Sequence, residues 1–447
     1  MHDALTATTT GLAATGFTRQ TVEALSAGKA EPAWMLEKRL LAWRIFDETP
    51  MPFWRRTDIS SLKLGDLAPY RAPVIAGGPF AGLPAEMLQA EDERWRAGAV
   101  LQRDSATVFS SLAPDLAARG VILTDLDTAV QKYPDLVKTY MMTTAIAPGE
   151  DKFTALHAAF WSGGMFLFVP QGVDIALPVV ALNWLDSAGL AFFTHTVVVA
   201  ERGSRVSVLE EFGSPTDEMR QSFHSGAVEI FVGDGAEVTY GEVQNFGPAV
   251  VTFTNKRAAQ KRDSTMRWVG AHLGSRLAHS RLHTTLDEPG GTMYMMGVYL
   301  ATGRQHLDMD SLIDHIAPHT KGDVIYRGII RDRAHTIFQG LIKVEKEAQL
   351  TDSYLANHNL LLSPKARADS IPTLEIEAND VRCTHGATVG QLDEEQLFYL
   401  RCRGLSRPDA ERLIVSGFVQ PVLDRIPEGG VRARMTAAVH AKLEATA

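Results

Sequence analysis

Cysteine is scarce in this sequence, with only Cys383 and Cys402 among 447 residues. A disulfide framework needs several pairs of cysteines, so none is expected to stabilise the chain. Such sparing use of cysteine is typical of proteins from a reducing cytoplasm. We therefore expect a cytoplasmic protein whose fold depends on its hydrophobic core.

Several catalytic and binding motifs are missing. There is no Gly-x-x-x-x-Gly-Lys-Ser/Thr loop, so we do not expect the chain to hydrolyse ATP itself. Cys-x-x-Cys and Gly-x-Ser-x-Gly motifs are also absent. The net charge of −9 argues against nucleic acid as the main partner, because phosphate binding needs a basic surface. We therefore expect a chain that is not an enzyme and binds no nucleic acid.

Neither a secretory signal nor a membrane span is expected. The first six residues lack a basic stretch followed by an apolar core. The most apolar stretch, residues 173–200, is interrupted by Asp174, Asn183, Asp186 and His195. Its alternating pattern is typical of buried strands, so no contact with a membrane is predicted.

Residues 1–145 are predicted to form a helical region. Leu36, Leu40 and Trp43 fall at helical spacing within residues 33–43, and the Pro-Met-Pro sequence at 50–52 should end that helix. Residues 91–100 and 125–138 are predicted to form two further helices. All of these are expected to pack on a core.

Residues 146–388 have the pattern of a β-rich core. Short runs of Val, Ile, Phe and Thr recur, separated by small residues and glycine. Residues 334–390 contain about four successive short strands with no Asn-Gly hairpin signal between them. This pattern favours a parallel β-helix, a solenoid that grows by stacking and so suits a chain too long for one ordinary core.

Residues 389–447 return to a helical pattern. Acidic residues at 393–395 suit a helix N-terminus, and Gly404 is a natural stop. Ser406 followed by Asp409 predicts the start of another helix. Cys402 lies four residues after Phe398 on the first of these helices and is expected to belong to the core.

Several stretches resemble the SufB/SufD family of iron–sulfur cluster assembly proteins, and they occur in the family's order. The carboxyl-terminal stretches are residues 359–363, 371–376, 380–390 and 396–404. The upstream stretches are residues 161–164, 169–173, 314–320 and 338–340. Within the family the chain is most similar to the SufD type. It has no cysteine at 354–363, where the SufB type carries one, although residues 31–36 look somewhat SufB-like.

This resemblance implies a right-handed parallel β-helix between helical end regions. It also implies pairing with a SufB-type paralogue through the β-helix, or with itself in isolation, and docking of a SufC-type ATPase on the C-terminal helices. The resembling SufD-type subunit is linked to iron supply. A cluster commonly takes four thiolates, so no cofactor is expected to be held tightly by this chain alone. Iron or a nascent cluster would be shared transiently with the partner subunit at their interface.

Cys383 and His385 are the candidate metal ligands. Residues i and i+2 of a strand share a face, and thiolate and imidazole suit iron, zinc or copper. Val381 shares that face too, so Cys383 could instead be a small core residue. The resemblance favours His385 at an interfacial metal site. His315 and His319 have the spacing of helical ligands, but a proline between them favours a structural role.

Two other functions remain open. A SufB-type scaffold would carry the nascent cluster itself, and the missing cysteine at 354–363 argues against it. A β-helix enzyme acting on polysaccharide would need clustered carboxylates and aromatic residues along the solenoid. No such cluster stands out in the sequence.

Overall fold

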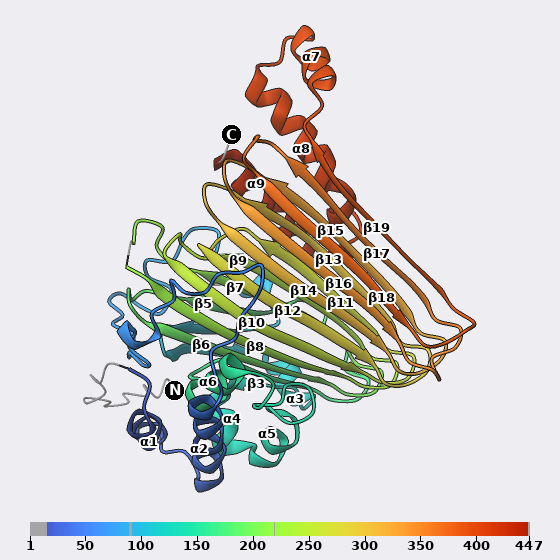
Figure 1. The fold of residues 1–447 in the computed structure, drawn as a ribbon. Helices are drawn as coiled ribbons and strands as arrows, with labels where there is room; N and C mark the ends of the chain where they lie inside the picture. Colours follow the sequence, from blue (N-terminus) through green and yellow to red (C-terminus); the bar gives the residue numbers. More distant parts are fainter. Residues whose placement is uncertain (1–15, 89–91, 219, 446–447) are drawn as a thin grey trace.

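The computed structural model describes residues 16–88, 92–218 and 220–445. The first residues, in which no signal sequence is expected, lie outside this described part. Two long sheets form the body of the molecule, and helices lie against them (Figure 1).

The chain alternates between the two sheets, so each coil of the solenoid adds one strand to each sheet. The first sheet contains β1 (Gly98–Arg103), β2 (Ala106–Leu112), β5 (Val179–Trp184), β7 (Arg205–Gly213), β9 (Glu237–Asn245), β11 (Thr265–His272), β13 (Thr292–Ala301), β15 (Lys321–Ile330), β17 (Asp352–Leu361) and β19 (Arg382–Gln391). The second contains β3 (Ile122–Asp125), β4 (Met165–Val169), β6 (Ala191–Ala200), β8 (Ser222–Val232), β10 (Val250–Gln260), β12 (Leu277–Leu286), β14 (His306–His315), β16 (His335–Val344) and β18 (Arg367–Ile376). The predicted parallel β-helix with flanking helices is confirmed.

The two ends of the solenoid differ. At the end near the N-terminus, β2 pairs antiparallel with β1, and β3 pairs antiparallel with β4. At the other end, β18 and β19 are the last strands of their sheets. Among the residues that the structure describes, each of these two strands pairs with a neighbouring strand on one side only.

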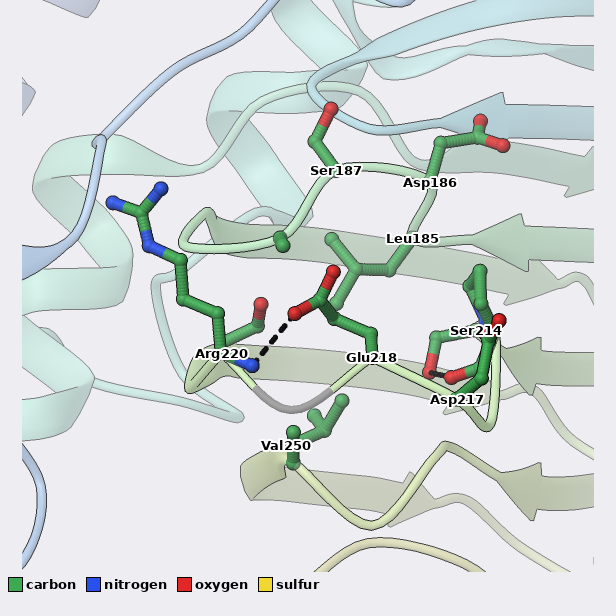
Figure 2. A pocket seen from close by; sticks show the side chains of 12 residues that line it. Leu185, Asp186, Ser187, Ser214, Asp217, Glu218, Arg220 and Val250 are labelled. Atoms are coloured by element: carbon green, nitrogen blue, oxygen red, sulfur yellow. Dashed lines mark hydrogen bonds between the residues drawn. The ribbon is translucent and has the colours of Figure 1, made fainter.

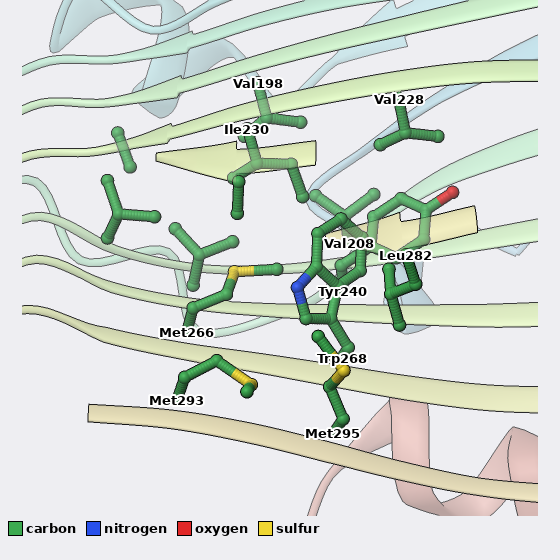
Figure 3. Packing of buried hydrophobic residues seen from close by; sticks show 14 of the residues in the cluster. Val198, Val208, Val228, Ile230, Tyr240, Met266, Trp268, Leu282, Met293 and Met295 are labelled. Carbon is green, nitrogen blue, oxygen red and sulfur yellow. The ribbon is translucent and has the colours of Figure 1, made fainter. Parts of the chain in front are cut away.

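The interior of the solenoid is packed by one face of every strand. Val208, Tyr240, Trp268 and Met295 lie in register on successive strands and are buried (Figure 3). Side chains of successive coils therefore stack in columns. This stacking explains why each strand appears in the sequence as a short apolar run.

Helices near the N-terminus cover the outer face of the second sheet. They are α1 (Arg19–Gly28), α2 (Ala33–Glu48), α4 (Leu126–Lys132), α5 (Pro134–Tyr140) and α6 (Lys152–Phe160), with a short 3-10 turn at Leu64–Asp66. The short helix α3 (Pro114–Ala118) instead packs its Leu116 on the interior core of the solenoid. The hydrophobic cluster beneath them includes Phe160 of α6 and Phe193, Phe223 and Phe253 of the sheet.

Two predicted helices in this region differ from the structure. Residue 91 lies outside the described residues. The rest of the 91–100 stretch is a 3-10 turn at Glu93–Trp95 followed by β1, so the prediction of a helix was wrong. Every residue of β1 is buried between β2 and β5, and this burial overrides a weak local helical pattern. The 125–138 stretch is divided into α4 and α5 at Pro134, which cannot donate a backbone hydrogen bond.

The C-terminal helices α7 (Glu394–Cys402), α8 (Arg407–Leu423) and α9 (Gly430–Ala445) lie on the first sheet's side. Val415 and Val419 of α8 and Val439 of α9 pack on its outer face. Arg434 of α9 forms a buried ion pair with Glu211 of β7, at 2.6 Å. The helix α7 packs mainly on α8 and projects beyond the solenoid (Figure 1).

Cys402 is exposed at the end of α7. Its prediction as a core residue was therefore wrong, because α7 projects away from the sheets. Helical spacing identified the helix but not which face would find a packing partner.

Candidate functional site

The candidate ligands Cys383 and His385 end two columns of interior side chains. The column that ends at His385 consists of Val208, Tyr240, Trp268, Met295, Val324 and Leu355. The column that ends at Cys383 consists of Val206, Val238, Met266, Met293, Gly322 and Ser353. Both side chains thus lie on the interior face of β19, as the i, i+2 spacing predicted. No further coil covers them in the part of the chain that the structure describes.

The two residues differ in exposure. Cys383 is half-buried and packs with Val381 against the interior core, whereas His385 is exposed. Burial, together with the carboxylate of Asp352, raises the pKa of the Cys383 thiol. The thiol is therefore protonated near neutral pH and must lose its proton to bind a metal ion. Cys383 is thus suited to the core as well as to a metal, and His385 is the more accessible ligand.

The chain does not complete a metal site by itself at this end. In the part of the chain that the structure describes, no group of three or more His, Cys, Asp or Glu side chains is arranged to hold a metal ion. Iron, zinc and copper sites are usually completed by three or more protein ligands or by solvent. Cys383 and His385 would therefore need further ligands from water or from a second chain.

The last two strands also carry free backbone hydrogen-bonding groups. The N–H group of Arg382 donates to the carbonyl of Thr351, which lies just before the neighbouring strand β17. The N–H group of Leu392 donates to the carbonyl of Leu361, the last residue of β17. Successive backbone N–H groups of a strand point to opposite sides. The even-numbered residues of β19 therefore direct their N–H groups towards β17, and residues 383, 385, 387, 389 and 391 direct theirs away from it. This unpaired edge is a template for another strand.

The remaining histidines that the sequence drew attention to are structural. His315 is fully buried, and its ring nitrogens contact the hydroxyls of Thr320 and Ser353 at 2.7 and 3.1 Å. His319 lies in the following turn with a φ of 60°. Among the residues that the structure describes, neither histidine belongs to a group of three or more potential metal ligands.

A buried polar chain lies beneath the N-terminal helices, and no motif or residue spacing predicted it. Ser225, His157, His195 and Glu229 are linked in that order by contacts of 3.1, 3.1 and 3.0 Å. Burial raises the pKa of Glu229 to about 8 and lowers that of His195 to about 3. All four groups are buried and partnered, so we assign the chain to holding α6 against β6 and β8.

A pocket of about 250 Å³ lies beside the ends of β5 and β7 and the start of β10 (Figure 2). Asp186, Asp217, Glu218 and Arg220 line it. Asp186 is already paired with Arg103 at 2.6 Å. No convergent set of ligands or nucleophile with a base is present among the side chains that line this pocket, so we do not assign it a function.

The projecting helices expose a second surface. Phe398 and Tyr399 of α7 are 69% and 58% exposed, and Leu413 of α8 is 54% exposed. Arg407 pairs with Glu394 of α7 and with Glu411 of α8. Large exposed apolar side chains on a projecting pair of helices are typical of a docking surface.

Two protein-family models match most of this chain. The family model described as SUF system FeS cluster assembly, SufBD core domain, matches residues 183–418, which is more than half of the chain. The model of the SufBD protein N-terminal region matches residues 106–180. The chain belongs to the SufBD family. The resemblance inferred from the sequence motifs is thereby confirmed.

Relatives within the SufBD family span nearly the whole chain. The iron–sulfur cluster assembly protein SufD of Bacillus subtilis is 33% identical over 416 residues, covering 93% of this chain and 95% of the relative. The iron–sulfur cluster assembly protein SufB of the same organism is 30% identical over 421 residues, covering 92% and 90%. An iron–sulfur cluster assembly SufBD family protein of Staphylococcus haemolyticus is also 30% identical over 421 residues. The two types are nearly equally similar, so overall identity does not decide between them.

Among the described helices of this SufBD protein, none combines the length and the apolar character that crossing a membrane requires.

Proposed function

We propose that this SufBD protein is a SufD-like subunit of an iron–sulfur cluster assembly complex and is not an enzyme on its own. It pairs with a SufB-type subunit through the open end of its solenoid and carries a SufC-type ATPase on α7 and α8. The observation that carries the proposal is that half-buried Cys383 and exposed His385 lie on an edge strand whose outer backbone groups are unpaired. A second chain pairing there would supply both the missing strand and the missing ligands.

The SufD-like role rests on the absence of cysteine from the strand β17, next to the open end of the solenoid. Asn357 and Asn359 of β17 are buried, and the side-chain amide of Asn357 donates a hydrogen bond to the hydroxyl of Tyr299 at 2.9 Å. No cysteine lies at residues 354–363, so this coil offers no thiolate to a cluster. A SufB-like scaffold is the second candidate, favoured by the similar identity to SufB. It would need Cys383 to carry sulfur or a cluster without a second thiolate nearby.

An anaerobic pull-down of the tagged chain from its own cells tests the proposal. We expect a SufB-type subunit and a small ATPase to be recovered, with iron present in the complex. Recovery of the chain alone and free of iron would contradict it. Recovery of an ATPase and a SufD-type subunit would favour the scaffold role.

His385→Ala is expected to reduce the iron and sulfide content of the anaerobically purified complex several-fold, because the exposed imidazole would no longer bind iron. His358→Ala is the matched control. His358 lies on the neighbouring strand, but it bonds to Thr388 at 2.8 Å on the outer face. An unchanged cluster yield with His385→Ala would refute the role of His385.

Replacement of both Phe398 and Tyr399 by serine is expected to remove the ATPase from the purified complex while the SufB-type subunit stays bound. These two side chains are exposed, so the change should not destabilise the fold. Deleting α7 to α9 would be a poorer test, because α8 and α9 cover the apolar outer face of the first sheet. An Arg401→Ser variant on the same helix is the control, and ATPase retention by the double variant would contradict docking here.

A further inference from the structure

A segment between α2 and the core reaches the open end of the solenoid. This strap, residues 49–58, follows α2 and lies on the outer face of the second sheet. The ring of Trp54 stacks on His279 with 4.1 Å between centroids. The buried hydroxyl of Thr57 donates a hydrogen bond to Asp308 at 2.6 Å. Anchors on both sides therefore fix the position of the two exposed arginines between them, Arg55 and Arg56.

Arg56 lines an open depression of about 510 Å³ at the end of the solenoid. The other lining residues come from both edge strands: Arg367, Ala368, Asp369, Ser370 and Ile371 from β18, and Ala387 and Val389 from β19. Arg55 is not among them. The strap thus contributes a cation to a surface otherwise formed by the last two strands.

The charges in this depression are not balanced. Arg367 pairs with Asp369 at 2.8 Å, and the same carboxylate contacts His335 at 3.0 Å. No hydrogen bond or ion pair reaches Arg56 from any other residue that the structure describes. The hydroxyl of Ser370 also has no partner within the described chain, but it is buried on the interior face of β18, in register with Phe338. An exposed guanidinium without a partner suits a carboxylate.

We propose that this depression receives a carboxylate side chain of the subunit that pairs with the open end, and that Arg56 binds it. The inference rests on the proposed function, because the depression opens directly onto the edges of β18 and β19. Whatever chain pairs with those edges also covers the depression. A charge pair at this position favours a partner with an acidic residue and disfavours one with a basic residue there. Arg56 is therefore a specificity-determining residue for the pairing.

The test compares Arg56→Glu with Arg55→Glu, its neighbour on the strap. The affinity of each full-length variant for the co-purified SufB-type subunit is measured at low and at high salt. Arg56→Glu is expected to weaken binding at least tenfold, because attraction is replaced by repulsion. Arg55→Glu makes the same change of charge outside the depression and is expected to weaken it far less. High salt should reduce the difference between wild type and Arg56→Glu.

The outcomes separate this inference from the pairing itself. If the wild-type chain does not bind the SufB-type subunit, the proposed function fails, and the specificity role of Arg56 fails with it. If the wild type binds and Arg56→Glu binds equally well, only the role of Arg56 is overturned. Equal weakening by both variants would overturn it too, because the effect would then reflect the total charge of the strap. Thermal unfolding of both variants checks that the exposed substitutions leave the fold intact.

Discussion

Ala387→Pro is expected to weaken pairing with the SufB-type subunit at least a hundredfold while the chain itself remains folded. Ala387 lies in the middle of β19, and its N–H is directed away from β17. Proline at this position removes a donor that an incoming strand would use, and its ring blocks close approach. The hydrogen bonds between β19 and β17 use the other residues of the strand and are retained.

The neighbouring strand shows that a proline is compatible with this fold. Arg367 and Glu377 direct their N–H groups to the carbonyls of Ala334 and Val344. By the same alternation, Pro372 of β18 occupies an outward-facing position, where no donor is needed within the chain. Ala387→Pro places a proline in the corresponding orientation on β19.

Analytical ultracentrifugation of the mixed subunits measures the effect of Ala387→Pro. Ala387→Val is the control, because it enlarges the side chain but keeps the N–H. We expect at least a hundredfold loss of affinity for the proline variant and a small change for valine. Full binding by the proline variant would show that the partner does not add a strand to β19.

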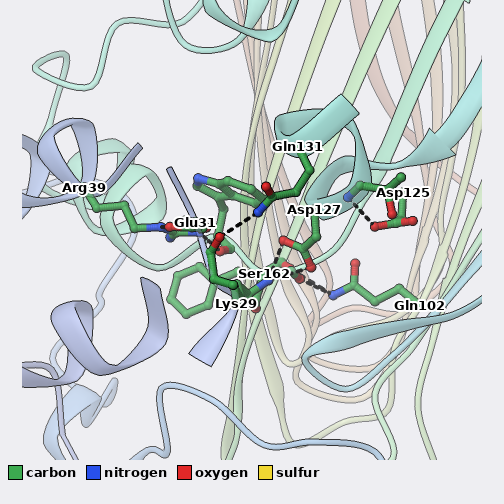
Figure 4. A network of polar contacts seen from close by, with 12 residues as sticks. Lys29, Glu31, Arg39, Gln102, Asp125, Asp127, Gln131 and Ser162 are labelled. Atoms are coloured by element: carbon green, nitrogen blue, oxygen red, sulfur yellow. Dashed lines mark hydrogen bonds and ion pairs between the residues drawn. The ribbon is translucent and has the colours of Figure 1, made fainter. Parts of the chain in front are cut away.

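Arg39→Ala is expected to lower the free energy of unfolding by about 3–5 kcal/mol, because it leaves a buried carboxylate without its partner. Arg39 and Glu31 are almost completely buried and pair at 2.6 Å (Figure 4). The guanidinium also donates to the carbonyls of Ala159 and Trp161 at 2.9 and 3.0 Å. It lies over the ring of Trp161, 4.4 Å from the centroid. This one side chain thus joins α2 to the end of α6.

Chemical unfolding followed by tryptophan fluorescence reports this change directly, because Trp161 contacts Arg39. Arg19→Ala is the control on the adjacent helix. Arg19 pairs with Glu23 at 2.9 Å, but its side chain is 68% exposed, so its loss should cost less than about 1 kcal/mol. If the free energy of unfolding of Arg39→Ala lies within about 1 kcal/mol of the wild-type value, water or a bound proton must compensate for the lost partner of the Glu31 carboxylate.

Patterns that repeat along the chain were predictable from the sequence. Each coil buries one face of its strands against the coils on either side. Short apolar runs with small residues between them therefore recur along the sequence, and this recurrence predicts the solenoid. The shared face of Cys383 and His385 was predictable for a similar reason, because the alternation of side chains is a local property of a strand. Whether that pair binds metal stays a prediction.

Features that depend on distant neighbours were not predictable. Residues 92–100 have a weak helical pattern, yet β1 forms there because β2 and β5 lie on both sides of it. Cys402 has core-like spacing, yet α7 projects into solvent. Arg56 had no distinguishing signal, because its place at the open end depends on contacts of the strap with β12 and β14, more than two hundred residues away.

The amino-acid order alone thus established the solenoid, its helical ends and a family in which such a fold takes part in iron–sulfur cluster assembly. Only the tertiary structure decided that His385 is exposed while Cys383 is half-buried, and that a strap from the N-terminal region lines the same end. The physical reason is the range of the interactions. Strand alternation and helical spacing act over a few residues and are visible in the sequence. Exposure depends on whether another coil stacks on a side chain, and none of the coils that the structure describes stacks on Cys383 and His385.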